Sequence, residues 1–92
     1  MQFEWDQAKS IENEKKHGVS FEEAIVIWDG IHLEISDIAH SEDGKERNAT
    51  MGWIGDRVFV VIWTVRGEKI RLISVRKARK NEEKVFFKKI QE

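Results

Sequence analysis

The sequence predicts an α+β domain, in which N-terminal helices pack on an antiparallel β-sheet meander that is followed by a C-terminal helix. Three runs of β-forming residues are separated by two dipeptides that begin with glycine, Gly55-Asp56 and Gly67-Glu68, which is typical of tight hairpins. Helix-capping signals precede these runs, and apolar residues at helical spacing follow them. A chain of 92 residues fits one domain, so we expect residues 1–92 to fold as one unit.

The first helix is expected directly after a very short strand. Residues 3–5 alternate between apolar and polar, which predicts the strand. Asp6 is placed to cap a helix that runs to about His17, and Gly18 supplies the left-handed residue that often follows a helix.

A capping box predicts the second helix. Ser20 and Glu23 have the spacing at which each side chain binds the backbone amide of the other. We expect this helix to end at Gly30. Its inward face should carry four residues at helical spacing, Phe21, Ala24, Ile25 and Trp28.

The remaining elements follow from alternation and from the two turns. Residues 32–36 predict an edge strand and residues 36–45 a polar loop. The meander strands are expected at about 46–54, 57–66 and 69–77. Residues 81–91 predict a closing helix that turns Val85, Phe86 and Ile90 inward.

The hairpin registers would gather cations on one face of the sheet. Counting back from each two-residue turn places Arg47 opposite Thr64 and Thr64 opposite Arg71. A second row on the same face holds the candidate substrate-binding residues Lys45, Arg66 and Lys69. The rest of that face should be apolar, with the rows Ala49/Ile62/Ile73, Met51/Val60/Val75 and Trp53/Val58.

Like charges across a ladder are destabilising, so a bound phosphate would relieve the repulsion in these rows. Arg76 and Arg79, where the last strand meets the closing helix, are further candidates for phosphate contact. Alternatively, the arginines of the two rows cover apolar surface with their stems and pair with carboxylates of the same chain. For Arg76 and Arg79, the alternative is a solvated start of the closing helix.

Charge is distributed unevenly along the chain. Residues 1–46 hold four basic and twelve acidic side chains, whereas residues 47–92 hold twelve basic and five acidic ones. The basic half predicts a surface for a polyanion or for an acidic protein partner. Attraction between the two halves within the fold is the alternative interpretation.

The composition excludes several kinds of chemistry. Without cysteine there is no disulfide, thiolate metal ligand or thiol nucleophile. The histidines lack metal-motif spacing, and no glycine-rich phosphate loop is present, so we expect neither a metal nor a cofactor. No signal peptide or membrane-length apolar run is visible, and we expect a cytoplasmic protein without membrane contact.

Metal-free RNA cleavage is compatible with the side chains that remain. The reaction needs the 2′-hydroxyl of the RNA, a proton acceptor, and cations that hold the phosphate as charge builds. Arg47, Arg71 and Arg76 are candidate cations, and His40 or Glu46 is a candidate proton acceptor. A non-catalytic module that binds RNA or a protein, or a purely structural subunit, is the alternative.

A set of motifs runs through nearly the whole chain. It comprises residues 3–6, Lys9, Asn13, the block Lys-His-Gly-Val-Ser-Phe-Glu-Glu-Ala at 16–24, Asp37, His40-Ser41, Glu46-Arg47, Gly52, Thr64-x-Arg66-Gly67, residues 70–78 and Glu82 or Glu83. Together these motifs resemble the BrnT toxins, the toxin half of a type II toxin–antitoxin pair.

The resemblance implies a RelE-like fold and a metal-independent endoribonuclease that inhibits translation. It implies a BrnA-type antitoxin with a ribbon-helix-helix DNA-binding domain, a complex of two toxins with two antitoxins, and contact with operator DNA only through that complex. The family's basic strands match this chain at Arg47, Thr64, Arg66, Arg71 and Arg76, and His17 is an additional catalytic candidate.

Two positions depart from the family pattern. Phe86-Phe87 stand where family members often have a tyrosine, and the chain has no tyrosine at all. A phenol therefore cannot serve as acid or base here. Trp63 stands where a histidine is common before the Thr-x-Arg segment.

Overall fold

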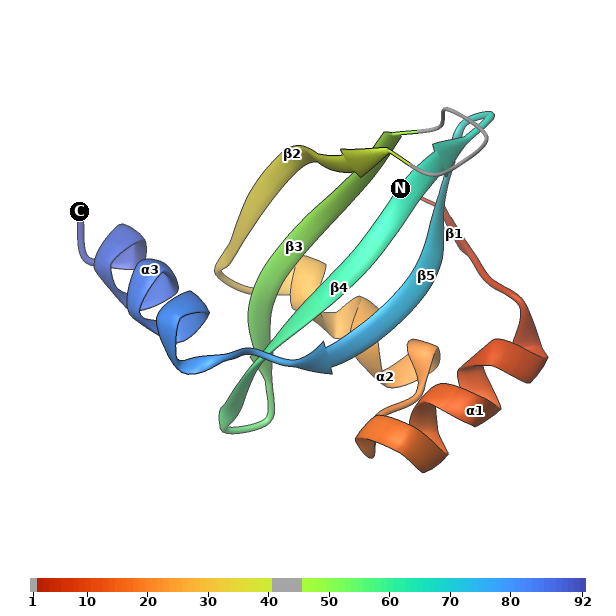
Figure 1. Ribbon diagram of the computed structural model, residues 1–92, viewed down its shortest axis with the longest axis horizontal. Coiled ribbons are helices and arrows are strands. Elements are labelled where there is room, and N and C mark those ends of the chain that lie inside the picture. Colours follow the sequence, from red (N-terminus) through yellow and green to blue (C-terminus); the bar gives the residue numbers. More distant parts are fainter. Residues whose placement is uncertain (1, 41–45) are drawn as a thin grey trace.

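The computed structural model describes the backbone of residues 2–40 and 46–92 and the side chains of residues 2–35 and 46–92. These residues form helices and a five-stranded sheet of order β1-β5-β4-β3-β2, which confirms the α+β class (Figure 1). β2 (His32–His40), β3 (Glu46–Ile54), β4 (Arg57–Arg66) and β5 (Lys69–Lys77) make the antiparallel meander. β1 (Gln2–Glu4) adds to β5 in parallel, so the sheet is mixed.

The N-terminal helices begin and end where the capping signals predict. The carboxylate of Asp6 accepts a hydrogen bond from the Ala8 amide at 2.9 Å at the start of α1 (Gln7–His17). Gly18 follows α1 with a left-handed φ of 77°. Ser20 and Glu23 form both hydrogen bonds of the capping box that starts α2 (Phe21–Ala24).

The second helix differs from expectation after its first turn. It tightens into the 3₁₀-helix η1 (Ile25–Asp29), which has three residues per turn instead of 3.6. This change rotates Ile27 into the core, whereas Ile25 and Trp28 are only half-buried. Ile25 and Trp28 still pack against the core from partly buried positions, so their predicted inward facing is confirmed.

α1, α2 and η1 pack on one face of the sheet, which we call the core face (Figure 1). Its buried residues come from the helices and from alternate positions of β4 and β5: Val19, Phe21, Ala24, Ile27, Phe59, Val61, Trp63, Ile70, Leu72 and Val75. The opposite side, which we call the open face, is only partly covered by α3 (Lys80–Ile90).

α3 contributes less to the core than its apolar residues predict. Phe86 is fully buried against the open face, but Val85 and Ile90 are 47% and 36% exposed. The inward positions predicted for Val85 and Ile90 are wrong, because α3 leads away from the end of β5 and extends past the sheet (Figure 1).

β2 is longer than the sequence predicts. Its backbone pairs with β3 as far as His40 opposite Glu46, through a register shift between Ile35 and Ala39. The predicted loop at residues 36–40 is therefore strand, because pairing with β3 outweighs the weak β-propensity of this polar segment. Lys45 and the rest of residues 41–45 lie outside the described residues.

The three meander strands have the predicted bounds, and both hairpins have the predicted register near their turns. Gly55 and Gly67 each have a φ of 63°, a left-handed value that favours glycine. Ile54 lies opposite Arg57, and Thr64 lies opposite Arg71.

A β-bulge changes the register farther along β5. The pairing shifts between Ile62 and Trp63, so Ser74 lies opposite Ile62 and Arg76 lies opposite Val60. The predicted pairs Ile62/Ile73 and Val60/Val75 are wrong, because the bulge adds one residue to β5 and reverses the facing of the residues beyond it. Val75 lies in the core as a result.

Candidate active site

Three polar residues lie side by side at one end of the open face. β-strand alternation puts Arg47 on the same face as Ala49, and Thr64 on the same face as Ile62. Arg71 lies directly opposite Thr64 on the next strand. Strand spacing therefore places the backbones of Arg47 and Arg71 about 10 Å apart, with Thr64 between them.

The bulge brings a further arginine to this face. Without the extra residue, Arg76 would point to the core side together with Leu72. With it, Arg76 lines a groove of about 270 Å³ on the open face. The sequence does not predict that Arg76 faces this groove, because no residue pattern near the bulge indicates it.

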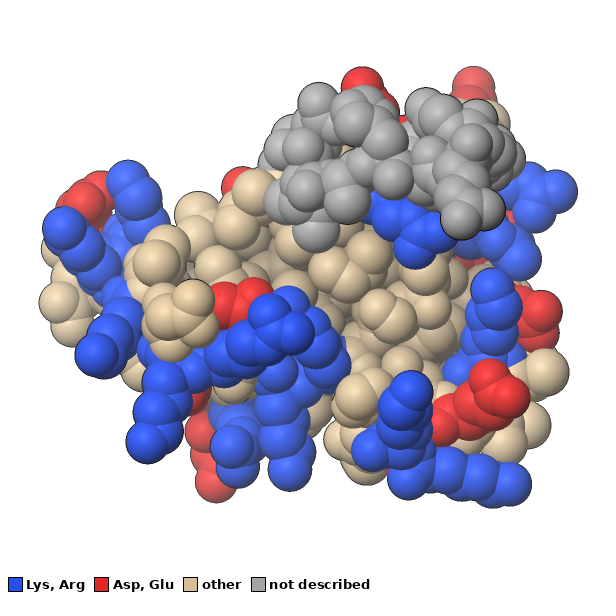
Figure 2. All heavy atoms as spheres, viewed as in Figure 1, with Lys and Arg blue, Asp and Glu red and all other residues tan. Residues whose placement is uncertain are grey.

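The groove has an apolar floor and a polar rim. β2, β3, β4 and α3 supply its apolar lining, and Arg76, Asn81 and Glu82 supply its polar atoms. Figure 2 shows this arrangement as a central area free of charged residues with Lys and Arg around it. The apolar residues that line the groove are Ile35, Ala49, Met51, Val60, Ile62 and Val85.

The Glu4 carboxylate lies close to two arginine side chains of the sheet. The carboxylate of Glu4 accepts a hydrogen bond from Arg71 Nη1 at 2.6 Å and lies 3.8 Å from Arg66 Nη1. Glu4 reaches Arg71 because β1 and β5 pair in parallel with these two residues as partners. The alternative that the arginines pair with carboxylates of the same chain is therefore correct for Arg71. In the sequence, only the apolar–polar alternation of residues 3–5 indicates β1.

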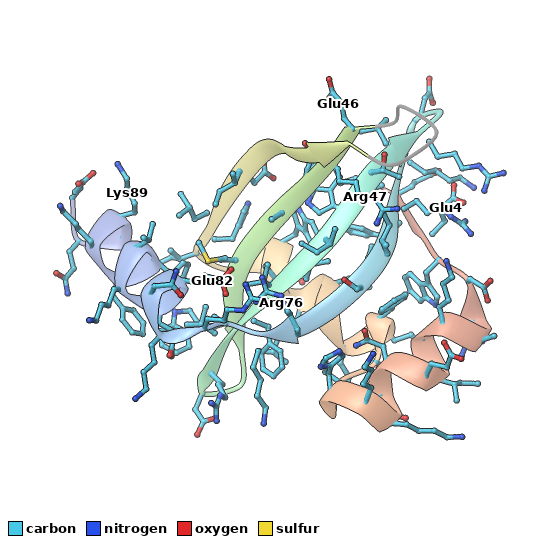
Figure 3. All side chains as sticks on the ribbon, viewed as in Figure 1. Glu4, Glu46, Arg47, Arg76, Glu82 and Lys89 are labelled. Atoms are coloured by element: carbon cyan, nitrogen blue, oxygen red, sulfur yellow. The ribbon has the colours of Figure 1, made fainter. Side chains whose placement is uncertain are left out.

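Arg76 is held by Glu82 from the first turn of α3. Its two terminal nitrogens donate to the two oxygens of Glu82 at 2.7 and 2.9 Å (Figure 3). The hydrogen bonds from Arg76, helped by one from the Arg79 amide, lower the pKa of Glu82 from its usual 4.5 to about 2. The same pair raises the pKa of Arg76. The Arg76 guanidinium is thus fixed in a bidentate pair with Glu82, and it still has N–H groups that can donate to another anion.

Arg47 differs from the other two arginines. Its guanidinium forms no ion pair with any of the described side chains. The hydroxyl of the neighbouring Thr64 donates a hydrogen bond to the backbone oxygen of Glu46 at 2.7 Å. Of these three arginines, Arg47 is therefore the one that no described carboxylate neutralises.

The two candidate proton acceptors are cross-strand partners. The backbone of His40 lies opposite Glu46 at the Arg47 end of the sheet, and the His40 side chain lies outside the described side chains. The Glu46 side chain extends past the end of β3 (Figure 3), and by strand alternation it does not share the face of Arg47. Lys69 lies opposite Arg66, as predicted for the second row of cations.

Comparison with known protein families places the chain in one of them. A family model described as "Ribonuclease toxin, BrnT, of type II toxin-antitoxin system" matches residues 5–82. The chain belongs to the BrnT family of ribonuclease toxins. No curated protein matches the chain closely enough to serve as a comparison.

The BrnT match covers most of the site but not all of it. Arg47, Thr64, Arg71, Arg76 and the paired carboxylate Glu82 lie within residues 5–82, whereas Glu4 precedes that range. In this BrnT chain, Trp63 lies in the core face, where its indole N–H donates to the hydroxyl of Thr50 at 2.8 Å. The position where a family histidine is common therefore points away from the open face.

Two further findings concern metal-binding clusters and membrane-length helices in this BrnT chain. Among the described side chains, no three His, Asp or Glu residues lie close enough together to hold a metal ion. No helix in the described part of the chain is both long and apolar enough to cross a membrane.

His17 and Arg79 lie away from Arg47. Both line a separate hollow of about 480 Å³ between the end of α1, the end of β5 and the start of α3. Arg76 lines this hollow as well as the open-face groove. The structure thus separates the predicted site residues into two neighbouring groups that share Arg76.

The Arg76–Glu82 pair predicts a pH-dependent stability. Because the folded state lowers the pKa of Glu82, the stabilisation is complete above about pH 4.5 and is lost as the pH falls toward 2. We expect Glu82→Gln to lower the free energy of unfolding by about 1–2 kcal/mol at pH 7, since the pair is partly exposed. Urea unfolding at several pH values measures this difference.

The neighbouring Glu83 supplies the matched control, since none of the described hydrogen bonds or ion pairs involves its carboxylate. Glu83→Gln should leave the free energy of unfolding nearly unchanged at every pH. A Glu82→Gln deficit that persists unchanged to pH 2 would show that the ionised pair is not its source.

Proposed function

We propose that this BrnT-family chain is a metal-independent endoribonuclease that acts in the cytoplasm, cuts RNA and thereby inhibits translation. The proposal depends on one observation, namely that Arg47, Thr64, Arg71 and Arg76 share the open face of one sheet. Fixed guanidinium groups stabilise the charge that develops on a phosphate during cleavage.

In the proposed reaction, the 2′-oxygen of the RNA forms a bond to phosphorus while the bond to the 5′-oxygen breaks. The 2′-hydroxyl proton passes to a general base, and the leaving 5′-oxygen receives a proton. The products are a 2′,3′-cyclic phosphate and a free 5′-hydroxyl. Arg47 and Arg71 bind the phosphate oxygens from both sides of Thr64, and Arg76 holds the next part of the strand.

His40 is the proposed proton acceptor. Its backbone lies in the strand next to Glu46 and Arg47, at the end of the sheet that carries the cations. Imidazole titrates near neutral pH, which suits a group that takes and returns a proton. Glu46, the cross-strand partner of His40, is the second candidate. Because the two residues are partners, alternation assigns both positions to the side opposite Arg47, and the preference for His40 rests on its chemistry alone.

We also propose that a BrnA-type antitoxin neutralises the chain. In this proposal a ribbon-helix-helix antitoxin forms a complex of two toxins and two antitoxins, and operator DNA is contacted only through it. The type II toxin–antitoxin family supports the presence of an antitoxin partner.

A second candidate function is RNA or protein binding without cleavage. It is favoured by the carboxylates of Glu4 and Glu82, which already partly neutralise Arg71 and Arg76. Less positive charge then remains to stabilise a transition state than the arginine count suggests.

Incubation of the purified protein with RNA in EDTA tests the proposal. We expect fragments with 2′,3′-cyclic phosphate ends, and no cleavage of RNA with 2′-O-methyl groups. Arg47→Ala should lower the cleavage rate about 100-fold, because it removes the arginine of the open face that no described carboxylate neutralises. Arg57→Ala is the matched control, since Arg57 is exposed and lies opposite Ile54 at the hairpin between β3 and β4, away from Arg47.

The outcomes separate the two candidate functions. Intact RNA that migrates as a complex with the protein would support the binding module and contradict the ribonuclease. Cleavage that stops in EDTA would contradict metal independence alone.

A further inference from the structure

The hollow next to the open face is strongly cationic. Its lining consists of Lys16, His17 and Gly18 from the end of α1, Arg76 and Lys77 from β5, and Arg79 before α3. None of the described residues that line it is acidic, and its volume of about 480 Å³ exceeds that of the open-face groove. Figure 2 shows Lys and Arg side chains gathered where β5 leads into α3 and over α1.

The fold holds these cations in place through Asn13. The Asn13 side chain donates hydrogen bonds to the backbone oxygens of Val19 and Val75, both at 2.9 Å, and accepts one from the Val75 amide at 3.1 Å. These bonds fasten the C-terminal half of α1 and the segment after it to β5, directly before Arg76. Lys16 and Lys77 therefore belong to one rigid corner although they are far apart in the sequence.

Among the described side chains, few carboxylates balance the charges in this corner. Of the residues that line the hollow, only Arg76 forms an ion pair with a described side chain, namely Glu82. Lys16, Lys77 and Arg79 are exposed and repel one another across the hollow. A bound anion would relieve this repulsion, and a phosphate diester is small enough to enter the space.

Arg76 connects this hollow to the open-face groove, since its side chain lines both. We propose that the hollow binds a backbone phosphate of the RNA, on the side of Arg76 away from Arg47. This inference rests on the proposed ribonuclease function and adds a second phosphate subsite to it. Lysine contacts to phosphate are independent of base sequence, so the subsite fixes the path of the strand and not its sequence.

A charge-matched pair of double variants tests the subsite. Lys16→Ala/Lys77→Ala removes two cations of the hollow, and Lys84→Ala/Lys88→Ala removes two exposed cations of α3. Binding of a fluorescent single-stranded 2′-O-methyl RNA, which is not cut, is measured by anisotropy at several salt concentrations. We expect the hollow variant to bind about 10-fold more weakly, with a salt slope smaller by about 1. The α3 variant should bind nearly as the wild type does.

Cleavage kinetics supply the second measurement. The hollow variant should raise KM with little change in kcat, because a distant phosphate contributes equally to ground-state and transition-state binding. Equal RNA affinity and salt slope in the two double variants would overturn the subsite. Equal RNA affinity with weakened binding of a purified antitoxin would instead assign the hollow to the protein partner.

The subsite and the ribonuclease can fail separately. Wild-type protein that binds the 2′-O-methyl RNA through the hollow but cuts no unmodified RNA contradicts the proposed function alone. Protein that cuts RNA but shows no difference between the two double variants contradicts the subsite alone.

Discussion

Arg71→Ala is expected to lower the rate of RNA cleavage about 100-fold or more, while the protein remains folded. Arg71 lies opposite Thr64 on the open face, where charge on the phosphate is expected to develop. Removal of one preorganised donor to such charge typically costs 100- to 1,000-fold in kcat. Single-turnover cleavage of a short RNA measures the loss, and the melting temperature confirms folding.

The Arg71–Glu4 pair gives this experiment its control. Alanine at position 71 also leaves Glu4 without its 2.6 Å partner and with only Arg66 at 3.8 Å, so a less neutralised carboxylate remains close to the phosphate. The double variant Glu4→Gln/Arg71→Ala removes that carboxylate charge as well. If the double variant is as slow as Arg71→Ala, the missing guanidinium accounts for the loss, and recovered activity would assign the loss to repulsion by Glu4. A folded Arg71→Ala protein that cuts at the wild-type rate would remove Arg71 from the mechanism.

Asn13→Ala is expected to lower the free energy of unfolding by about 3 kcal/mol. Asn13 is buried, and its loss leaves the Val19 oxygen and both backbone groups of Val75 without their partner. Each buried polar group without a hydrogen bond costs about 1–3 kcal/mol, partly relieved where water can enter. Urea unfolding at neutral pH measures the change.

Asn81→Ala is the matched control for this variant. Asn81 is exposed in the first turn of α3, and its replacement should change the free energy of unfolding by less than about 0.5 kcal/mol. Because Val75 directly precedes Arg76, Asn13→Ala should also reduce cleavage under conditions in which the variant stays folded. An Asn13→Ala protein as stable as Asn81→Ala would contradict the role of Asn13 in fastening α1 to β5.

Local chemistry made most of the fold predictable. Asp6 and the Ser20–Glu23 capping box start the two N-terminal helices where the sequence places them. The Gly-first turns fix the bounds of β3, β4 and β5, and they place Thr64 opposite Arg71. Such signals depend on residues within a few positions of one another, and for that reason a single sequence contains them.

The candidate site was predictable only in part. Arg47, Thr64 and Arg71 follow from the turn registers, and the basic half of the chain indicates an anionic ligand. The division of the cations into an open-face group and a hollow did not follow, since it depends on how α1 docks against β5. The apolar periodicity of α3 likewise gave no indication that Val85 and Ile90 remain exposed.

By itself, the sequence determined the element order, the helix caps, the hairpin turns and membership of the BrnT family. Only the tertiary structure decided that β1 joins β5 and brings Glu4 to Arg71, a residue 67 positions away. It also decided the bulge that turns Arg76 toward the open face, where Glu82 holds it. The physical reason is that a bulge and a long-range ion pair are selected by the packing of whole elements, and that packing has no signature in the residues next to them.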